Sequence, residues 1–191
     1  PHGQAGGPYW GSVTFAPDGR TLAVVSNSGI SLANSDGTNR HDDLITYPSI
    51  GLGHTSYTPP IYWSADSQFL RTIVPDSADI FAQDPTFTIW QLSVDGAATP
   101  LSTLHGFPLD VTLSPDLSQV AFWKPVSQGS NIRELHVASV DGAWDMVYAT
   151  GDSLELKGWA PDSRQFVYWF FNEQRPYLGR LCAEAVSLVE P

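Results

Sequence analysis

Four stretches of the sequence superpose without a gap: FAPDGRTLAVVS from Phe15, WSADSQFLRTIV from Trp63, LSPDLSQVAFWK from Leu113 and WAPDSRQFVYWF from Trp159. They share one aspartate each, at positions 18, 66, 116 and 162, so the spacings are 48, 50 and 46 residues. A fixed period of about 20 to 50 residues is typical of repeat architectures, and a period this long leaves room for about four strands per repeat.

The shared stretch predicts a hairpin. Proline precedes three of the four aspartates, and its fixed φ suits the second residue of a type I turn. The aspartate beside it can bond its own backbone, so we interpret it as turn chemistry and not as a ring of cation ligands. The residues after each turn, such as LAVV from Leu22 and VAFW from Val120, are nearly continuous apolar sequence, as expected of a strand buried on both faces.

A second turn signal follows in three of the repeats. Asp36-Gly37, Asp95-Gly96 and Asp141-Gly142 each follow a run rich in strand formers. Asp-Gly between such runs predicts a hairpin with a type I′ turn, because glycine supplies positive φ without strain. The fourth repeat has Glu184-Ala185 instead, so we expect a different last hairpin. Each repeat thus reads as four antiparallel strands, with a loop of variable length between the second and third.

The Pro-Asp box followed by a Val-Asp-Gly hairpin resembles the WD40-like β-propeller repeats of TolB and its relatives, which also build the propeller domains of prolyl-oligopeptidase-type peptidases. The likeness covers about residues 12 to 190. This sequence departs from the family pattern in two ways. Ala65 replaces the proline in the second repeat, and glycine does not follow Asp66, Asp116 or Asp162. The resemblance implies a periplasmic or extracellular scaffold that binds other proteins, with no cofactor.

These observations predict an all-β chain forming a β-propeller of four-stranded antiparallel blades. We expect an N-terminal linker over residues 1–11 and a propeller over 12–191, with blades at about 12–50, 58–104, 109–150 and 155–190. Four blades either close into a ring or form part of a larger propeller. An arc that does not close would expose apolar faces at both ends, so we then expect self-association. Because the sequence begins without methionine, we expect a piece of a longer precursor, or a processed or excised domain.

Charge narrows the choice of partners. The 191 residues carry 20 acidic and 9 basic side chains, a formal net charge of −11. This balance disfavours nucleic acid and anionic membrane surfaces, which are bound mainly through Lys and Arg. No apolar run approaches the roughly 18 residues that a membrane span needs. A protein or peptide is therefore the expected partner.

Arg71 stands out within the repeat. It lies five residues after the box aspartate, where the other repeats have small apolar residues at 23, 121 and 167. A guanidinium on a buried strand must be paired or reach water, because an unpaired buried charge is costly. We therefore expect a carboxylate or several backbone carbonyls around Arg71, and we keep open that it meets a ligand carboxylate.

Two histidines precede the second and third boxes at similar distances. His54 and His105 lie 12 and 11 residues before their aspartates, in connections between blades that come together at one end of a propeller. Asp110 is a carboxylate in a comparable loop. Two imidazoles could begin a metal or anion site, but with no third ligand evident we predict no metal.

Three aromatic residues near turns or hairpin ends complete the candidate binding residues: Tyr57, Trp90 and Trp144. Exposed aromatic side chains in such places often anchor a partner.

Catalytic motifs are absent from the sequence. It contains no Gly-x-Ser-x-Gly elbow, no His-Glu-x-x-His helix and no glycine-rich phosphate loop. We therefore predict no catalytic residue. Two functions stay open: a non-catalytic interaction or sensor module that binds through loops at one end of the propeller, or the substrate-gating propeller of a prolyl-oligopeptidase-type peptidase whose catalytic domain lies outside this chain.

Overall fold

The computed structural model describes residues 11–52, 55–82, 84–127, 130–152, 154–170, 172–173, 175–181 and 183–187. These residues form strands, turns and loops. They contain no helix with the length and hydrophobicity needed to cross a membrane.

Sixteen of the strands form four antiparallel sheets. The first contains β1 (Ser12–Phe15), β2 (Thr21–Val25), β3 (Gly29–Asn34) and β4 (His41–Thr46). The second contains β7 (Ile61–Trp63), β8 (Phe69–Pro75), β9 (Thr86–Ser93) and β10 (Ala98–His105). The third contains β11 (Phe107–Leu113), β12 (Gln119–Pro125), β13 (Ile132–Ser139) and β14 (Asp145–Asp152). The fourth contains β15 (Leu154–Trp159), β16 (Gln165–Phe170), β17 (Arg175–Arg180) and β18 (Ala183–Ser187). An additional small hairpin, β5 (Gly51–Leu52) with β6 (Thr55–Ser56), lies in the connection between the first two sheets and was not predicted.

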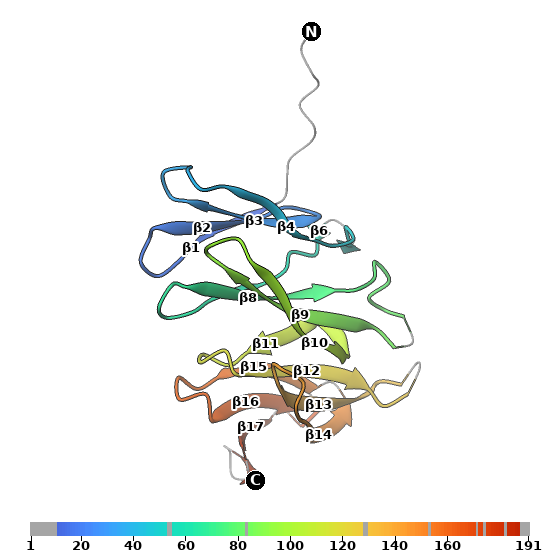
Figure 1. Cartoon of the computed structure of the whole chain (residues 1–191). Helices are drawn as coiled ribbons and strands as arrows, with labels where there is room; N and C mark the ends of the chain where they lie inside the picture. Colours follow the sequence, from blue (N-terminus) through green and yellow to red (C-terminus); the bar gives the residue numbers. More distant parts are fainter. Residues whose placement is uncertain are drawn as a thin grey trace.

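The four sheets are stacked in chain order, each a meander whose strands pair with their sequence neighbours (Figure 1). This confirms the all-β class and the four-stranded antiparallel units. The first and last sheets lie at opposite ends of the stack, so the four units form an open array and not a closed ring.

The box aspartates are turn residues, as expected. In all four turns the backbone N–H of the residue after the aspartate donates to the carbonyl three positions earlier, at 2.8–3.0 Å. Each aspartate also accepts the backbone N–H two residues on, at 2.9–3.1 Å. The residue after the aspartate has positive φ every time, with angles of 70°, 61°, 63° and 59° at Gly19, Ser67, Leu117 and Ser163.

The Asp-Gly turns differ from the prediction. Positive φ occurs at Gly37, Gly96 and Gly142, but the preceding aspartates are not in that region. Each glycine N–H donates to the carbonyl three residues earlier, as in the Pro-Asp turns. These are therefore type I turns followed by a left-handed glycine, and not type I′ turns. The last hairpin does differ from the others, because it turns between Arg180 and Ala183 and places Glu184-Ala185 inside β18.

The core consists mainly of three apolar layers, one between each pair of adjacent sheets. Leu32 meets Leu70 and Leu92 between the first two sheets. Phe87 packs edge-on against Phe122, with ring centroids 5.4 Å apart, between the second and third. The third layer, between the last two sheets, is the most aromatic and includes Trp123, Phe166 and Tyr168, each at most 2% exposed. The two middle sheets are thus buried on both faces, as their apolar strands predicted. The prediction was wrong for LAVV in the first sheet, where Val24 is 39% exposed, because no described sheet covers its outer face.

Candidate functional site

The loops that join the second and third strands of the sheets lie at one end of the stack, together with the connections between sheets (Figure 1). The longest such loop joins β8 to β9. We call this end the loop end and the opposite one, with the Pro-Asp and Asp-Gly turns, the turn end.

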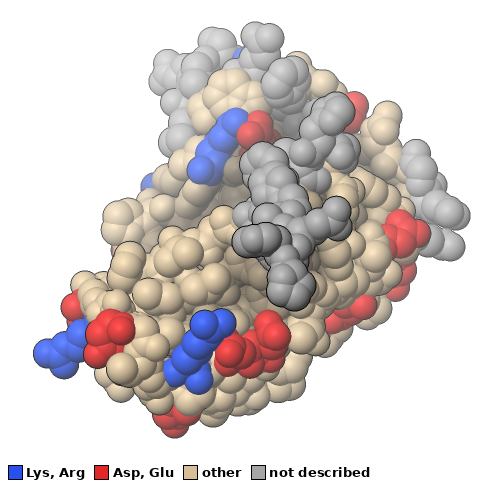
Figure 2. Space-filling model, turned by 90° about the horizontal axis from the view of Figure 1, so that it is seen from above, with Lys and Arg blue, Asp and Glu red and all other residues tan. Residues whose placement is uncertain are grey.

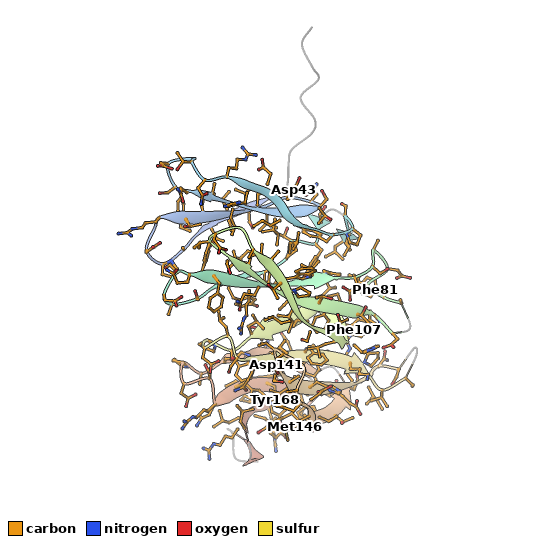
Figure 3. The ribbon with its side chains drawn as sticks, in the orientation of Figure 1. Asp43, Phe81, Phe107, Asp141, Met146 and Tyr168 are labelled. Carbon is orange, nitrogen blue, oxygen red and sulfur yellow. The ribbon has the colours of Figure 1, made fainter. Side chains whose placement is uncertain are left out.

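Two aromatic side chains, Phe81 and Phe107, lie at the loop end (Figure 3). Phe81, on the β8–β9 loop, is 68% exposed, and its ring centroid is 6.5 Å from that of Phe107 at the start of β11. The guanidinium carbon of Arg133, on β13, lies 5.5 Å from the centroid of the Phe107 ring. Phe81, Phe107 and Arg133 thus bring the second and third sheets together in one surface, which we call the loop-end patch. Val126, on the β12–β13 connection, and Ile132, the first residue of β13, are also at the loop end and are about half exposed.

Tyr57 lies beneath these loops and supports them. It was expected to be an exposed anchor, but it is 7% exposed and packs with Ile50 and Ile80. Its hydroxyl donates to the carbonyl of Ile73 at 3.1 Å. Burial raises the pKa of Tyr57, so the phenol stays protonated and continues to donate this bond. Tyr57 therefore fixes the connection between the first two sheets and offers no surface to a partner.

His105 meets a carboxylate at the loop end. Its Nδ1 lies 2.8 Å from Oδ2 of Asp84, and both side chains are more than half exposed. His54 lies outside the described residues, so the expected pairing of the two histidines stays a prediction. Asp110 lies in β11, and its side chain also falls outside what the structure describes. Among the described residues no three histidine, cysteine or acidic side chains are grouped as a metal site would require.

Arg71 is held inside the stack near the turn end. Its Nη2 and Nε donate to Oε1 of Gln91 at 3.0 and 3.2 Å, and its Nη1 donates to the carbonyl of Leu117 in the next sheet. The expectation of a carboxylate or several carbonyls was wrong in detail, because an amide oxygen and one carbonyl satisfy the guanidinium. Burial lowers the pKa of Arg71, and the nearby carboxylates of Asp116 and Asp141 oppose this shift. Arg71 joins two sheets, which accounts for it without a ligand.

The two remaining aromatic candidates lie in different environments. Trp90, on β9, is half-buried and packs against the layer between the first two sheets, so it is not an exposed anchor. Trp144 is 38% exposed and lines a cleft of about 420 Å³ with Met146, Tyr148 and Leu181. This cleft lies between the edge of the third sheet and the fourth sheet, away from the loop-end patch.

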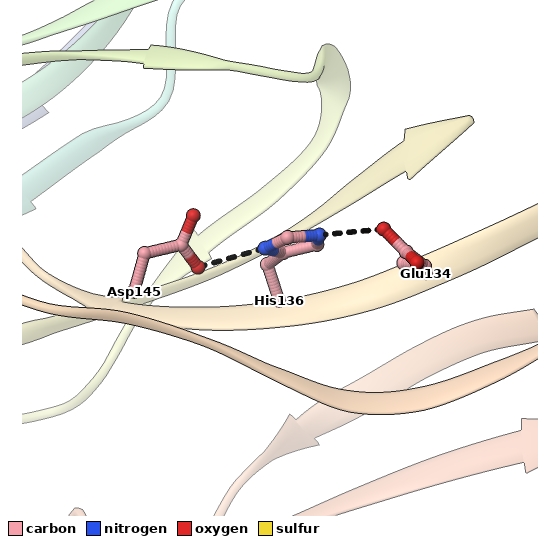
Figure 4. A network of polar contacts seen from close by, with 3 residues as sticks. All are labelled: Glu134, His136 and Asp145. Carbon is pink, nitrogen blue, oxygen red and sulfur yellow. Dashed lines mark hydrogen bonds and ion pairs between the residues drawn. The ribbon is translucent and has the colours of Figure 1, made fainter. Parts of the chain in front are cut away.

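A buried histidine on β13 was missed by sequence reasoning (Figure 4). The Nδ1 of His136 lies 2.7 Å from Oδ1 of Asp145, and its Nε2 lies 3.2 Å from Oε2 of Glu134. Its ring is also stacked on Phe122, with centroids 5.2 Å apart. Only the imidazolium carries a proton on both nitrogens and can donate to both carboxylates. Glu134 and His136 are two residues apart in a predicted strand, so their side chains share one face. This spacing could have predicted their contact from the sequence.

Comparisons with known proteins support the fold. No family model matches the chain, and no curated protein matches it in sequence. A solved oligogalacturonate lyase in complex with manganese matches 98% of this chain and 54% of its own, with a TM-score of 0.58 and 14% identity. The β-propeller domain of the Trilobed protease from Pyrococcus furiosus matches 96% of this chain and 58% of its own, with a TM-score of 0.54 and 8% identity.

A peptidase shares the same architecture. A structure from a study of two prolyl endopeptidases matches 94% of this chain and 29% of its own, with a TM-score of 0.58 and 13% identity. A protein from Agrobacterium tumefaciens assigned as TolB superposes less well, with a TM-score of 0.48. This chain has a β-propeller fold. It spans about half the length of the lyase and of the protease propeller, so it corresponds to part of each of those proteins. Identities this low establish the fold alone, because one propeller architecture serves many functions.

Proposed function

We propose that this propeller module binds a protein or peptide partner through the loop-end patch and takes no catalytic part itself. The observation that carries the proposal is the exposure of Phe81 on the longest variable loop, beside Phe107 and Arg133. Aromatic and arginine side chains are the residue types that most often dominate protein interfaces.

The patch also indicates the chemistry of the partner. The exposed ring of Phe81 offers apolar surface, so it favours an aromatic or branched aliphatic side chain. Arg133 is a cation in a chain of net charge −11, and its planar guanidinium suits a carboxylate. We therefore expect a peptide with an apolar residue close to an acidic residue or to its C-terminal carboxylate. The TolB-like resemblance favours a site of action outside the cytoplasm.

A peptide selection tests the proposal. Peptides that bind the full chain would first be selected from a random displayed library. Fluorescence anisotropy would then measure how strongly each peptide binds the unaltered chain and the variant Phe81→Ala. We expect binding to weaken about tenfold or more, the typical loss of a central aromatic contact. Trp144→Ala is the matched control, because it removes an exposed aromatic residue from a different surface, and it should bind normally. Equal binding of the peptides to Phe81→Ala would contradict the proposal.

The substrate-gating role in a prolyl-oligopeptidase-type peptidase stays the alternative. It would use the same fold, and a serine hydrolase domain encoded beside this chain would favour it. The proposal also states that the chain takes no catalytic part. Mass spectrometry of the selected peptides after incubation with the chain checks this statement, and the peptides should remain intact.

A further inference from the structure

The outer face of the first sheet is apolar and exposed. Val13 and Phe15 pair with Val24 and Leu22 across β1 and β2, so their side chains share this face. Val13 is 60% exposed, Phe15 56% and Val24 39%. A cleft of about 360 Å³ runs along it, lined in part by Leu22, Val24 and Ala33. We call Val13, Phe15, Leu22, Val24 and Ala33 the leading face. Seen from this end, most of the described surface that is visible is uncharged, and several of the Lys and Arg side chains lie beside Asp or Glu (Figure 2).

The repeat shows what this face is built to contact. The position of Val24, six residues after the box aspartate, is occupied in the other sheets by Thr72, Phe122 and Tyr168, which are 0%, 1% and 2% exposed. The position of Leu22 is occupied by Leu70, Val120 and Phe166, each 0% exposed. In those three sheets this face packs against the preceding sheet. The leading face therefore has the composition of an interface between sheets.

The opposite end of the stack offers the complementary face. Val167 pairs with Leu178 across β16 and β17, so both lie on the side of the fourth sheet that faces away from the third. Trp169 shares that side, and the equivalent residues Val25, Ile73 and Trp123 are at most 1% exposed. A cleft of about 390 Å³ opens beside Val167 and Leu178. We call Val167, Trp169 and Leu178 the trailing face.

The cations beside the two faces are paired within their own sheets. Arg40, which lines the leading cleft, bonds to Asp42, and Lys157, which lines the trailing cleft, lies 2.6 Å from Glu155. Neither cation therefore has to lose a partner on another sheet when the faces meet.

We propose that the leading face of one copy of this chain packs on the trailing face of a second copy, as consecutive sheets pack inside the stack. The occupant is a second copy because the trailing face reproduces the side of a sheet that meets the next sheet at each internal interface. The contact is head-to-tail, because the two faces lie at opposite ends of the molecule (Figure 1).

Two charge substitutions test the contact, one on each face. Val24→Asp on the leading face and Leu178→Asp on the trailing face each bury an unpaired carboxylate, so each should weaken self-association at least about tenfold. Val126→Asp, at an exposed valine of the loop end, is the matched control and should associate like the unaltered chain. Sedimentation velocity over a range of concentrations gives the association constants, and circular dichroism verifies that each variant is folded.

Mixing the two variants makes the test specific for a head-to-tail arrangement. Val24→Asp keeps an intact trailing face and Leu178→Asp an intact leading face, so an equimolar mixture should form a dimer that neither variant forms alone. An unaltered chain that stays monomeric at every concentration would overturn the proposal. So would either variant that still associates by itself, or a mixture that does not dimerise.

Discussion

The backbone N–H of Asp116 donates a hydrogen bond of 2.9 Å to the hydroxyl of Ser163, 47 residues further along the chain. The first two sheets make the equivalent contact, because the N–H of Asp18 donates to the hydroxyl of Ser67 at 3.1 Å. Between the second and third sheets the corresponding residue is Leu117, which has no hydroxyl, and Arg71 donates to its carbonyl instead. Each pair of neighbouring sheets is therefore joined at the turn end by at least one polar contact.

Removal of the Ser163 hydroxyl should loosen the fourth sheet. Ser163→Ala keeps nearly the same side-chain volume and removes the hydroxyl that accepts the Asp116 N–H and also bonds the Asp116 side chain. We expect a loss of about 1 kcal/mol in the free energy of unfolding, the usual net worth of such a bond. Urea denaturation measures it, and Ser127→Ala, on an exposed loop, serves as the control. An unchanged midpoint for Ser163→Ala would show that the contact does not stabilise the stack.

Gly96 should be the least replaceable of the Asp-Gly glycines. Gly37 and Gly96 have similar positive φ, 82° and 93°, so alanine at either position costs about 1 kcal/mol in backbone strain. A Cβ at Gly37 meets nothing within 4 Å, whereas at Gly96 it would lie 2.5 Å from Nδ1 of His41 in the first sheet. We therefore expect Gly96→Ala to lower the midpoint of thermal unfolding more than Gly37→Ala. Equal losses would mean that His41 moves aside freely.

Acid should destabilise the fold through the turn aspartates. Hydrogen bonds from the Ser64 hydroxyl and the Gln68 backbone N–H hold the pKa of Asp66 below its ordinary value of 3.8. The unfolded chain then binds more protons than the folded chain as the pH drops below about 4, so this stability is present above that pH and is lost as the pH falls through the folded pKa.

Asp66→Asn isolates this effect. The amide oxygen can still accept the Gln68 N–H, but it does not titrate, so the decline of the urea midpoint below about pH 4 should become shallower. Identical pH profiles for the variant and the unaltered chain would count against a role of Asp66 in acid sensitivity.

The sequence predicted the features that depend on local chemistry and repeat spacing. Asp18 and its three equivalents indicated every first turn, because proline and aspartate act through their own backbone. The strand after each turn followed from its apolar residues. The type of the Asp-Gly turns was missed because a type I′ turn and a type I turn followed by a left-handed residue both place glycine at positive φ. The two differ only in the φ of the preceding aspartate.

The candidate site was harder to predict, because exposure depends on how the connections fold over one another. Tyr57 and Trp90 have the residue type expected of anchors, yet the neighbouring connections cover Tyr57 and Trp90 packs against the layer between the first two sheets. Phe81 had no distinguishing pattern beyond its place in the longest variable loop. His136 and Asp145 lie on neighbouring strands, so their contact depends on the register of β13 and β14, which single-sequence reasoning did not consider.

Hydrogen–deuterium exchange with a selected peptide tests the central claim most directly, because it shows where the partner sits. If the loop-end patch is the binding site, the peptide should slow exchange in the β8–β9 loop around Phe81 and at the start of β13 around Arg133, and leave the turns at Gly37 and Gly142 unchanged. Protection confined to the turn end, or to the cleft around Trp144 and Met146, would contradict binding through the loop end.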